Sequence, residues 1–240
     1  MTTQLMPTLP LGSIGGALEF IFEAQPSNVT GGNLVGGFDQ TMELALTQLE
    51  VTVFALLLSL AVALPAGLYL GHRGVGELAA IGFGNAGRAI PELALIAFMA
   101  AWIGVGTVNL TIALAVLGIP PILTNAFVGI RQVDRAPVEA ARGIGMTEPE
   151  ILLKVELPLA IPTIMAGVRL ATIAIVATAT IAPLAGVVTL GDYIINENVY
   201  GENGVVAGAI VVALMALALE LLLALVQRRL TSKGLKLGPA

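Results

Sequence analysis

The stretch Val138–Pro158, VEAARGIGMTEPEILLKVELP, is a charged island between two runs of apolar sequence. Pro137 suits the first turn of a helix, where its missing N–H is not needed, and Gly145 is well placed to end that helix. Thr147 and Glu150 have the spacing of a capping box, which predicts a second helix directly after the glycine bend. This stretch therefore predicts two short helices that meet at a glycine and lie in water.

The apolar runs on either side predict an all-α membrane protein. Hydrophobic residues make up 57% of the 240 residues and charged residues only 11%, which is far from the balance of an ordinary water-soluble domain. A transmembrane helix needs about 20 apolar residues to cross about 30 Å of hydrocarbon. We therefore expect about five transmembrane helices, at about 44–70, 79–103, 107–128, 159–183 and 204–226.

The distribution of charge predicts the orientation of these spans, because Lys and Arg gather in cytoplasmic loops. Segments 1–43 and 184–203 contain no Lys or Arg but seven acidic residues, so both are expected outside the cell. We expect the N-terminus outside and the C-terminus in the cytoplasm. Nine of the eleven basic residues lie in three segments that are expected to be cytoplasmic: Arg73; Arg131, Arg135, Arg142 and Lys154; and Arg228, Arg229, Lys233 and Lys236.

One membrane domain accounts for most of the chain. Residues 1–43 are expected to form an extracytoplasmic or interfacial segment, in which Leu9–Phe22 is too short and too glycine-rich to span. Residues 44–226 form the transmembrane domain, with the helical loop at 134–158, and residues 227–240 form a basic cytoplasmic tail.

Motifs for catalysis or cofactor binding are missing from the sequence. It has no phosphate-binding loop and no Gly-Lys dipeptide, so the chain is not expected to hydrolyse ATP by itself. Cysteine is absent, and His72, the single histidine, stands beside Arg73 at a predicted cytoplasmic turn, where a solvated side chain is expected. We expect no metal, no cofactor and no catalysis, and the scattered basic residues do not form a stripe for nucleic acid.

Charged residues inside the predicted spans are functional candidates, because a mid-helix arginine costs about 2.5 to 3.5 kcal/mol on insertion scales. Arg88 and Glu92 are four residues apart on the second span, around a helix-kinking Pro91, and are expected to share a face. They can form an intrahelical ion pair or line a transport pathway. Arg169 lies deep in the fourth span, where structural pairing and pathway lining are both open.

A stripe of small residues follows the fourth span. Gly167 and Ala171 are four residues apart, as are Ala174 and Thr178, and such a stripe lets helices approach closely. We interpret the stripe as a candidate face for a second membrane subunit.

The helical loop resembles the EAA loop of type I ABC importer permeases, where it docks the ATP-hydrolysing subunit. The motif consists of Glu139, Ala140 and Ala141, then Gly145, then Val155, then Leu157 and Pro158, at matching spacing. The resemblance implies a MetI-like permease in a bacterial or archaeal cell membrane, surrounded by lipid. It also implies three partners: a cytoplasmic ABC ATPase, a second identical or related permease subunit, and an extracytoplasmic substrate-binding protein.

Two further segments, Asn85–Ala94 and Gly118–Ile130, look like the osmoprotectant branch of these permeases. That branch imports glycine betaine, choline, carnitine and related quaternary amines, which implies this substrate class here. The resemblance adds Asn125 to Arg88, Glu92 and Arg169 as candidates for the translocation pathway. Trp102, Tyr193 and Tyr200 near the outer face are too few for an aromatic cage, so substrate selection is expected in the binding protein.

Three alternatives remain at this point. An amino-acid importer, for methionine for example, would share the same loop. An ion-coupled secondary carrier would be expected to show intramembrane carboxylates or an inverted repeat, and the sequence offers only Glu92 and Glu220 near span ends. A structural membrane scaffold would leave the spacing of the loop motif unexplained.

Overall fold

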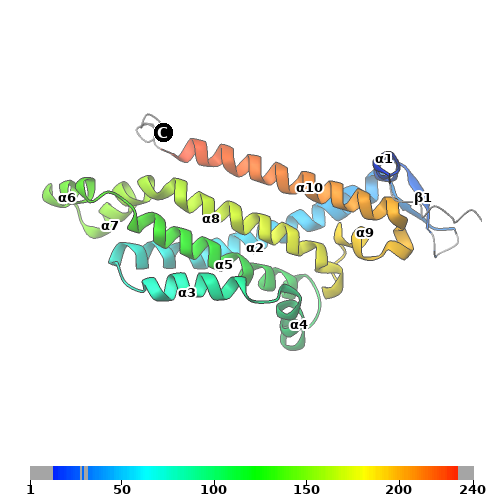
Figure 1. Ribbon diagram of the computed structural model, residues 1–240, viewed down its shortest axis with the longest axis horizontal. Helices are drawn as coiled ribbons and strands as arrows, with labels where there is room; N and C mark the ends of the chain where they lie inside the picture. The colour runs from blue at the N-terminus through cyan, green and yellow to red at the C-terminus, as the bar shows by residue number, and fades with distance from the viewer. Residues whose placement is uncertain (1–12, 28, 30–31, 232–240) are drawn as a thin grey trace, which may run out of the picture.

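The computed structural model describes residues 13–27, 29 and 32–231, and the chain forms an elongated bundle of helices (Figure 1). Within the described residues, four helices are long and apolar enough to cross a membrane. They are α2 (Gly37–Arg73), α5 (Thr107–Arg131), α8 (Leu157–Thr178) and α10 (Glu197–Leu230). They run along the length of the bundle, as four of the five expected spans.

The second expected span is divided into two helices, α3 (Glu77–Arg88) and α4 (Glu92–Ile103). The sequence predicts one helix with a kink at Pro91, but Pro91 instead caps the start of α4. Proline lacks an N–H and disfavours a helical conformation in the residue before it, so the helix ends before Pro91 rather than bending through it. Figure 1 shows α3 along the bundle and α4 turning away from it. Arg88 ends α3 and Glu92 begins α4, so the two residues do not share a helix face.

Helix α5 lies at the centre of the bundle and packs against both α2 and α8. Close approach depends on glycine, because a Cβ added to Gly67 of α2 would lie 2.6 Å from the Cβ of Ala126. The small-residue stripe serves the same purpose, since Gly167, Ala171 and Thr178 are buried inside this chain. The expectation that this stripe forms the face for a second subunit is therefore wrong for these three residues.

Residues before α2 form more structure than the expected glycine-rich lead. Helix α1 (Ile14–Phe22) is followed by a short antiparallel pair of strands, β1 (Ala24–Pro26) and β2 (Leu34–Gly36). Helix α2 then begins at Gly37 rather than near 44, after Gly36 and Gly37 turn the chain with φ of 78° and 81°. Residues 1–12 of the predicted N-terminal segment lie outside the described part of the chain.

Helix α1 packs against the segment that connects α8 to α10 and against the start of α10. After α8 come the 3₁₀ helix η2 (Ala179–Ala185) and α9 (Gly191–Ile195). Phe20 of α1 is buried together with Tyr193 of α9 and Ala207 of α10, so α1 packs on protein rather than only at a membrane surface. We call this end of the bundle the acidic end.

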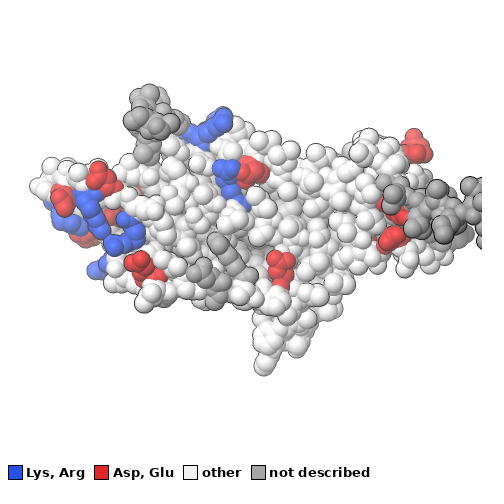
Figure 2. All heavy atoms as spheres, in the orientation of Figure 1, with Lys and Arg blue, Asp and Glu red and all other residues white. Residues whose placement is uncertain are grey.

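The opposite end carries the helical loop: α6 (Arg135–Gly143), α7 (Glu148–Ile151) and the π-helical segment η1 (Leu152–Glu156), which continues into α8. The second helix of the loop is thus continuous with the fourth span. We call this end of the bundle the basic end, because Lys and Arg gather there (Figure 2). At the acidic end, the charged residues on the visible face are Asp and Glu. The charge asymmetry that predicts the membrane orientation is therefore an asymmetry of the folded bundle.

Candidate functional site

Helix α6 has the boundaries that its capping residues predict. The side chain of Asp134 accepts a hydrogen bond from the N–H of Ala136 at 3.1 Å. At the other end, Gly145 has φ of 86°, and the Met146 N–H donates to the Ala141 carbonyl at 3.1 Å. A left-handed glycine with this bond is a common end for a helix, because glycine has no Cβ to oppose positive φ.

The predicted docking residues divide between two faces of α6. Glu139, Ala140 and Gly145 are exposed, whereas Ala141 is buried with Val138 and Ile151 in a small core of the loop. Both alanines belong to the docking motif, but only Ala140 is placed where a partner can contact it. The loop is therefore a packed unit with its own core and an exposed outer face.

Helix α7 begins with the predicted capping box, because the Glu150 carboxylate accepts from the Thr147 N–H at 3.0 Å. Lys154 also contacts Glu150, at 2.9 Å, and these bonds lower the pKa of Glu150 to about 2. Arg142 donates two hydrogen bonds to Glu148, at 3.1 and 3.0 Å. Both pairs are exposed, so each adds little stability, and only the Arg142–Glu148 pair joins α6 to α7.

His72 has a different environment from the one the sequence predicts. It lies in the last turn of α2, and its Nδ1 is 2.6 Å from the Glu156 carboxylate while its Nε2 is 3.3 Å from that of Glu148. The side chains of His72 and Glu156 are only 10% and 5% exposed. The expectation of a solvated histidine is wrong, and sequence patterns could not indicate the contact because the two residues are 84 positions apart.

Leu157 and Pro158 connect the loop to the membrane bundle. Leu157 packs against the core shared by α2, α5 and α8, and both residues are half-buried. The Leu157 N–H bonds to the Leu152 carbonyl, which is the wider spacing of a π-helix. Pro158 has no N–H for the normal partner carbonyl one turn earlier, and the π-helical turn lies where that donor is missing.

Arg169 forms an ion pair with Glu220 of α10 inside the bundle, with its Nε 2.8 Å from the carboxylate. Its Nη1 also donates to the side chain of Gln227 at 3.1 Å. Structural pairing, one of the two alternatives left open by the sequence, is therefore present. Arg88 closes α3, but its side chain lies outside the described part of the structure.

A cavity of about 380 Å³ lies where α3 gives way to α4, against α5 and α8. Its size is within the range of small-molecule sites in proteins. Among the described residues that line it, Glu92 carries the only charge. The wall consists of Gly87, Ile90 and Glu92, then Leu117, Pro120 and Pro121 of α5, and Leu170 and Ala174 of α8.

Asn125 lies beside this cavity without lining it. Its Nδ2 donates to the Pro121 carbonyl at 2.8 Å, and its Cβ lies against Gly167 of α8. Of the four pathway candidates, Glu92 therefore faces the cavity, Asn125 supports the helix behind it, and Arg169 is held by α10.

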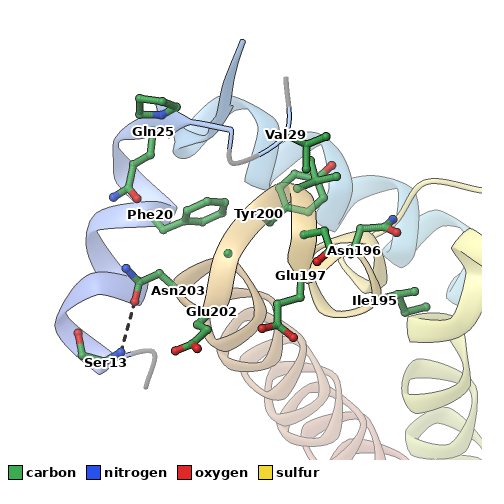
Figure 3. Close-up of a pocket in the computed structure, with 14 residues that line it drawn as sticks. Ser13, Phe20, Gln25, Val29, Ile195, Asn196, Glu197, Tyr200, Glu202 and Asn203 are labelled. Atoms are coloured by element: carbon green, nitrogen blue, oxygen red, sulfur yellow. Dashed lines mark hydrogen bonds between the residues drawn. The ribbon is translucent and has the colours of Figure 1, made fainter. Parts of the chain in front are cut away.

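A second and larger cavity, of about 1100 Å³, lies at the acidic end between α1, the β1–β2 hairpin and the start of α10 (Figure 3). Phe20 and Tyr200 line it, with ring centres 6.4 Å apart. The Tyr200 hydroxyl donates to Asp192 at 2.5 Å. Tyr193 and Tyr200 lie against each other at this end, with ring centres 4.8 Å apart, whereas Trp102 lies exposed at the end of α4.

An apolar bundle with four helices long enough to span, among the described residues, and an exposed helical loop at one end is the architecture of a multi-pass membrane protein. The chain belongs to the family of binding-protein-dependent transport system inner membrane components, whose model matches residues 63–232. It is a non-catalytic transport subunit of the inner membrane. Helix α1 and the hairpin precede the matched segment.

Two curated relatives are similar over most of their length. The glycine betaine/carnitine/choline transport system permease protein OpuCB of Bacillus subtilis is 40% identical over 189 residues, which are 78% of this chain and 87% of that protein. The carnitine transport permease protein OpuCB of Listeria monocytogenes is 38% identical over the same shares of both chains.

Solved structures support the same fold. An inward-facing structure of the MetNI methionine ABC transporter matches with a TM-score of 0.70 at 20% identity, over 80% of this chain and 96% of that chain. An amino acid ABC transporter crystallised with histidines matches with a TM-score of 0.61 at 23% identity, over 79% and 93% of the two chains.

Proposed function

We propose that this chain is the membrane-spanning subunit of an ATP-driven importer for quaternary-amine solutes such as glycine betaine, choline and carnitine. The observation that carries this proposal is the similarity to relatives that are named as transporters of these solutes, at 38 to 40% identity. The structural similarity to a methionine transporter is weaker, at 20% identity, and supports the fold alone.

The central cavity fits this substrate class chemically. A quaternary ammonium has no N–H to donate, so it is recognised by charge and by close apolar contact. The cavity offers Glu92 as a negative charge, next to the apolar wall of Pro120, Pro121, Leu170 and Ala174. We infer that Glu92 attracts the cation where α3 gives way to α4.

The helical loop is the proposed docking site of a separate ATPase. The chain has no phosphate-binding loop, so the free energy of ATP has to reach it through a contact between proteins. Glu139 and Ala140 face outward from a packed helix pair at the basic end, which suits a rigid docking element. An extracytoplasmic binding protein is then expected at the acidic end, and a second permease subunit beside this one.

The test is uptake of radiolabelled choline by proteoliposomes that contain the permease, its ATPase and its binding protein. We expect uptake to require ATP and the binding protein, and to be competed by glycine betaine or carnitine but not by proline or methionine. Competition by methionine alone would identify an amino-acid importer instead. Uptake that follows an ion gradient without ATP would contradict the ABC mechanism.

A variant of the cavity tests the substrate contact separately. Glu92→Gln removes the charge at nearly constant volume, and we expect it to raise the KM for choline with little change in the amount of assembled complex. The matched control is Glu77→Gln, because Glu77 is an exposed glutamate at the other end of α3.

A further inference from the structure

We propose that His72 is a positioning residue that fastens the helical loop to the end of α2, so that the first span moves with the loop when the ATPase moves it. This inference rests on the proposed function of the loop as the ATPase docking site. It adds a mechanical connection to a helix that is not next to the loop in the sequence.

The contact is a clamp that is buried on the Glu156 side and exposed on the Glu148 side. His72 lies between two carboxylates, with Glu156 at 2.6 Å from Nδ1 and Glu148 at 3.3 Å from Nε2. Glu156 belongs to η1 and Glu148 to the first turn of α7, so one ring holds two consecutive segments of the loop. Glu148 is also bound by Arg142 of α6, which extends the connection from α2 to both loop helices.

The chemistry of the ring explains why a histidine suits this position. The two nitrogens of a histidine ring are both polar and point in different directions, so one ring can contact both carboxylates at once. The C-terminal turn of a helix also favours a side chain that can carry a positive charge. His72 occupies that turn of α2, next to Gly74, which ends the helix.

The contact matters for the transmission of movement because α2 is not next to the loop along the chain. The loop is joined covalently to α5 and α8, but α2 reaches it only through side-chain contacts. Close to His72, Gly71 packs so tightly on α5 that a Cβ would lie 2.9 Å from the Cβ of Ile130. Helix α5 in turn carries Pro120 and Pro121, which line the central cavity. A displacement of the loop would therefore be passed through α2 to α5, which lines the cavity.

The experiment compares solute imported per ATP hydrolysed in the reconstituted complex with its ATPase and loaded binding protein. His72→Ala removes the shorter contact and Glu156→Gln removes its negative charge, and we expect solute imported per ATP to fall about fivefold or more. Hydrolysis stimulated by the binding protein should persist, because the docking face on α6 is untouched. The double variant is expected to be no worse than either single one, since both remove the same interaction.

Two further variants separate positioning from folding. His72→Gln keeps an N–H donor for Glu156 and should recover part of the transport per ATP. Lys154→Gln breaks the exposed pair with Glu150 in the same loop and should leave transport per ATP unchanged. Assembly is measured for every variant by copurification of the permease with the ATPase and by thermal unfolding.

The proposal is overturned if His72→Ala and Glu156→Gln assemble and import a normal amount of solute per ATP. It is also overturned if none of the His72 and Glu156 variants assembles, because the contact is then structural only. Glu139→Lys on α6 distinguishes this failure from failure of the proposed function. If Glu139→Lys abolishes stimulated hydrolysis while the His72 variants import a normal amount of solute per ATP, the loop is still the docking site and only the role of His72 is contradicted.

Discussion

Arg169 of α8 and Glu220 of α10 form an ion pair inside the apolar bundle, with side chains 33% and 25% exposed. The pair joins two helices that are 51 residues apart at the paired positions. Helix α10 is mostly exposed along its length, and only Gly204, Ala207 and Gly208 near its start are buried. The ion pair is therefore a specific attachment for the half of α10 that lies toward the basic end.

We predict that Glu220→Ala lowers the thermal unfolding midpoint of the permease, because it leaves Arg169 without its anionic partner in an apolar setting. The measurement is thermal unfolding of the purified complex in detergent. The double variant Arg169→Leu with Glu220→Leu should recover most of the loss, since it removes both charges. A double variant as unstable as Glu220→Ala would contradict the account.

We predict that Gly167→Ala destabilises the packing of α5 on α8. An added Cβ would lie 2.5 Å from the Cβ of Asn125 and 2.7 Å from the Pro121 carbonyl, so the two helices have to separate. Overpacking of this kind typically costs about 1 to 3 kcal/mol. The control is Gly82→Ala on α3, where no atom lies within 4 Å of the added Cβ. Equal unfolding midpoints for the two variants would contradict the prediction.

The orientation of the bundle is open to a direct labelling test, because the natural sequence has no cysteine. We predict that Asn198→Cys and Val29→Cys react with an impermeant thiol reagent in intact cells and that Thr147→Cys does not. All three residues are exposed, whereas Ser27 is buried and unsuited to the test. Labelling of Thr147→Cys from outside the cell would reverse the proposed orientation.

Local signals in the sequence predict the helical loop well. Gly145 and the pair Thr147 and Glu150 act over three or four residues, and the structure contains both the glycine end and the capping box. Pro91 predicts an irregularity in the second span, but the sequence does not distinguish one kinked helix from two separate helices. That outcome depends on how α4 packs, which is a tertiary property.

Long-range contacts were beyond sequence reasoning. His72 and Glu156 are each unremarkable in the sequence, and only the packing of α2 against the loop brings them together. The partner of Arg169 was equally hidden, although an arginine within a membrane-spanning helix signals that some partner exists. The β1–β2 hairpin was missed because strands of three residues are too short to show a periodic pattern.

The last prediction concerns the outer face of the loop, where Glu139 and Gly145 are exposed. We predict that Glu139→Lys and Gly145→Asp abolish transport and substrate-stimulated ATP hydrolysis while the permease still inserts at near-normal levels. Glu139→Lys reverses a charge on the proposed docking face, and Gly145→Asp adds a charged side chain next to it. The assay is ATP turnover with and without loaded binding protein, in membranes matched for permease content.

Gly145→Ala separates docking from helix ending in this experiment. No atom lies within 4 Å of an added Cβ, so the cost of alanine comes from the positive φ of 86° and amounts to about 1 to 2 kcal/mol. Gly145→Ala should therefore lower the unfolding midpoint yet keep hydrolysis tied to transport, because a methyl group hardly changes the exposed face. If Gly145→Asp and Glu139→Lys both retain full stimulated turnover and uptake, the loop is not the docking site, and the energy of ATP enters this permease elsewhere.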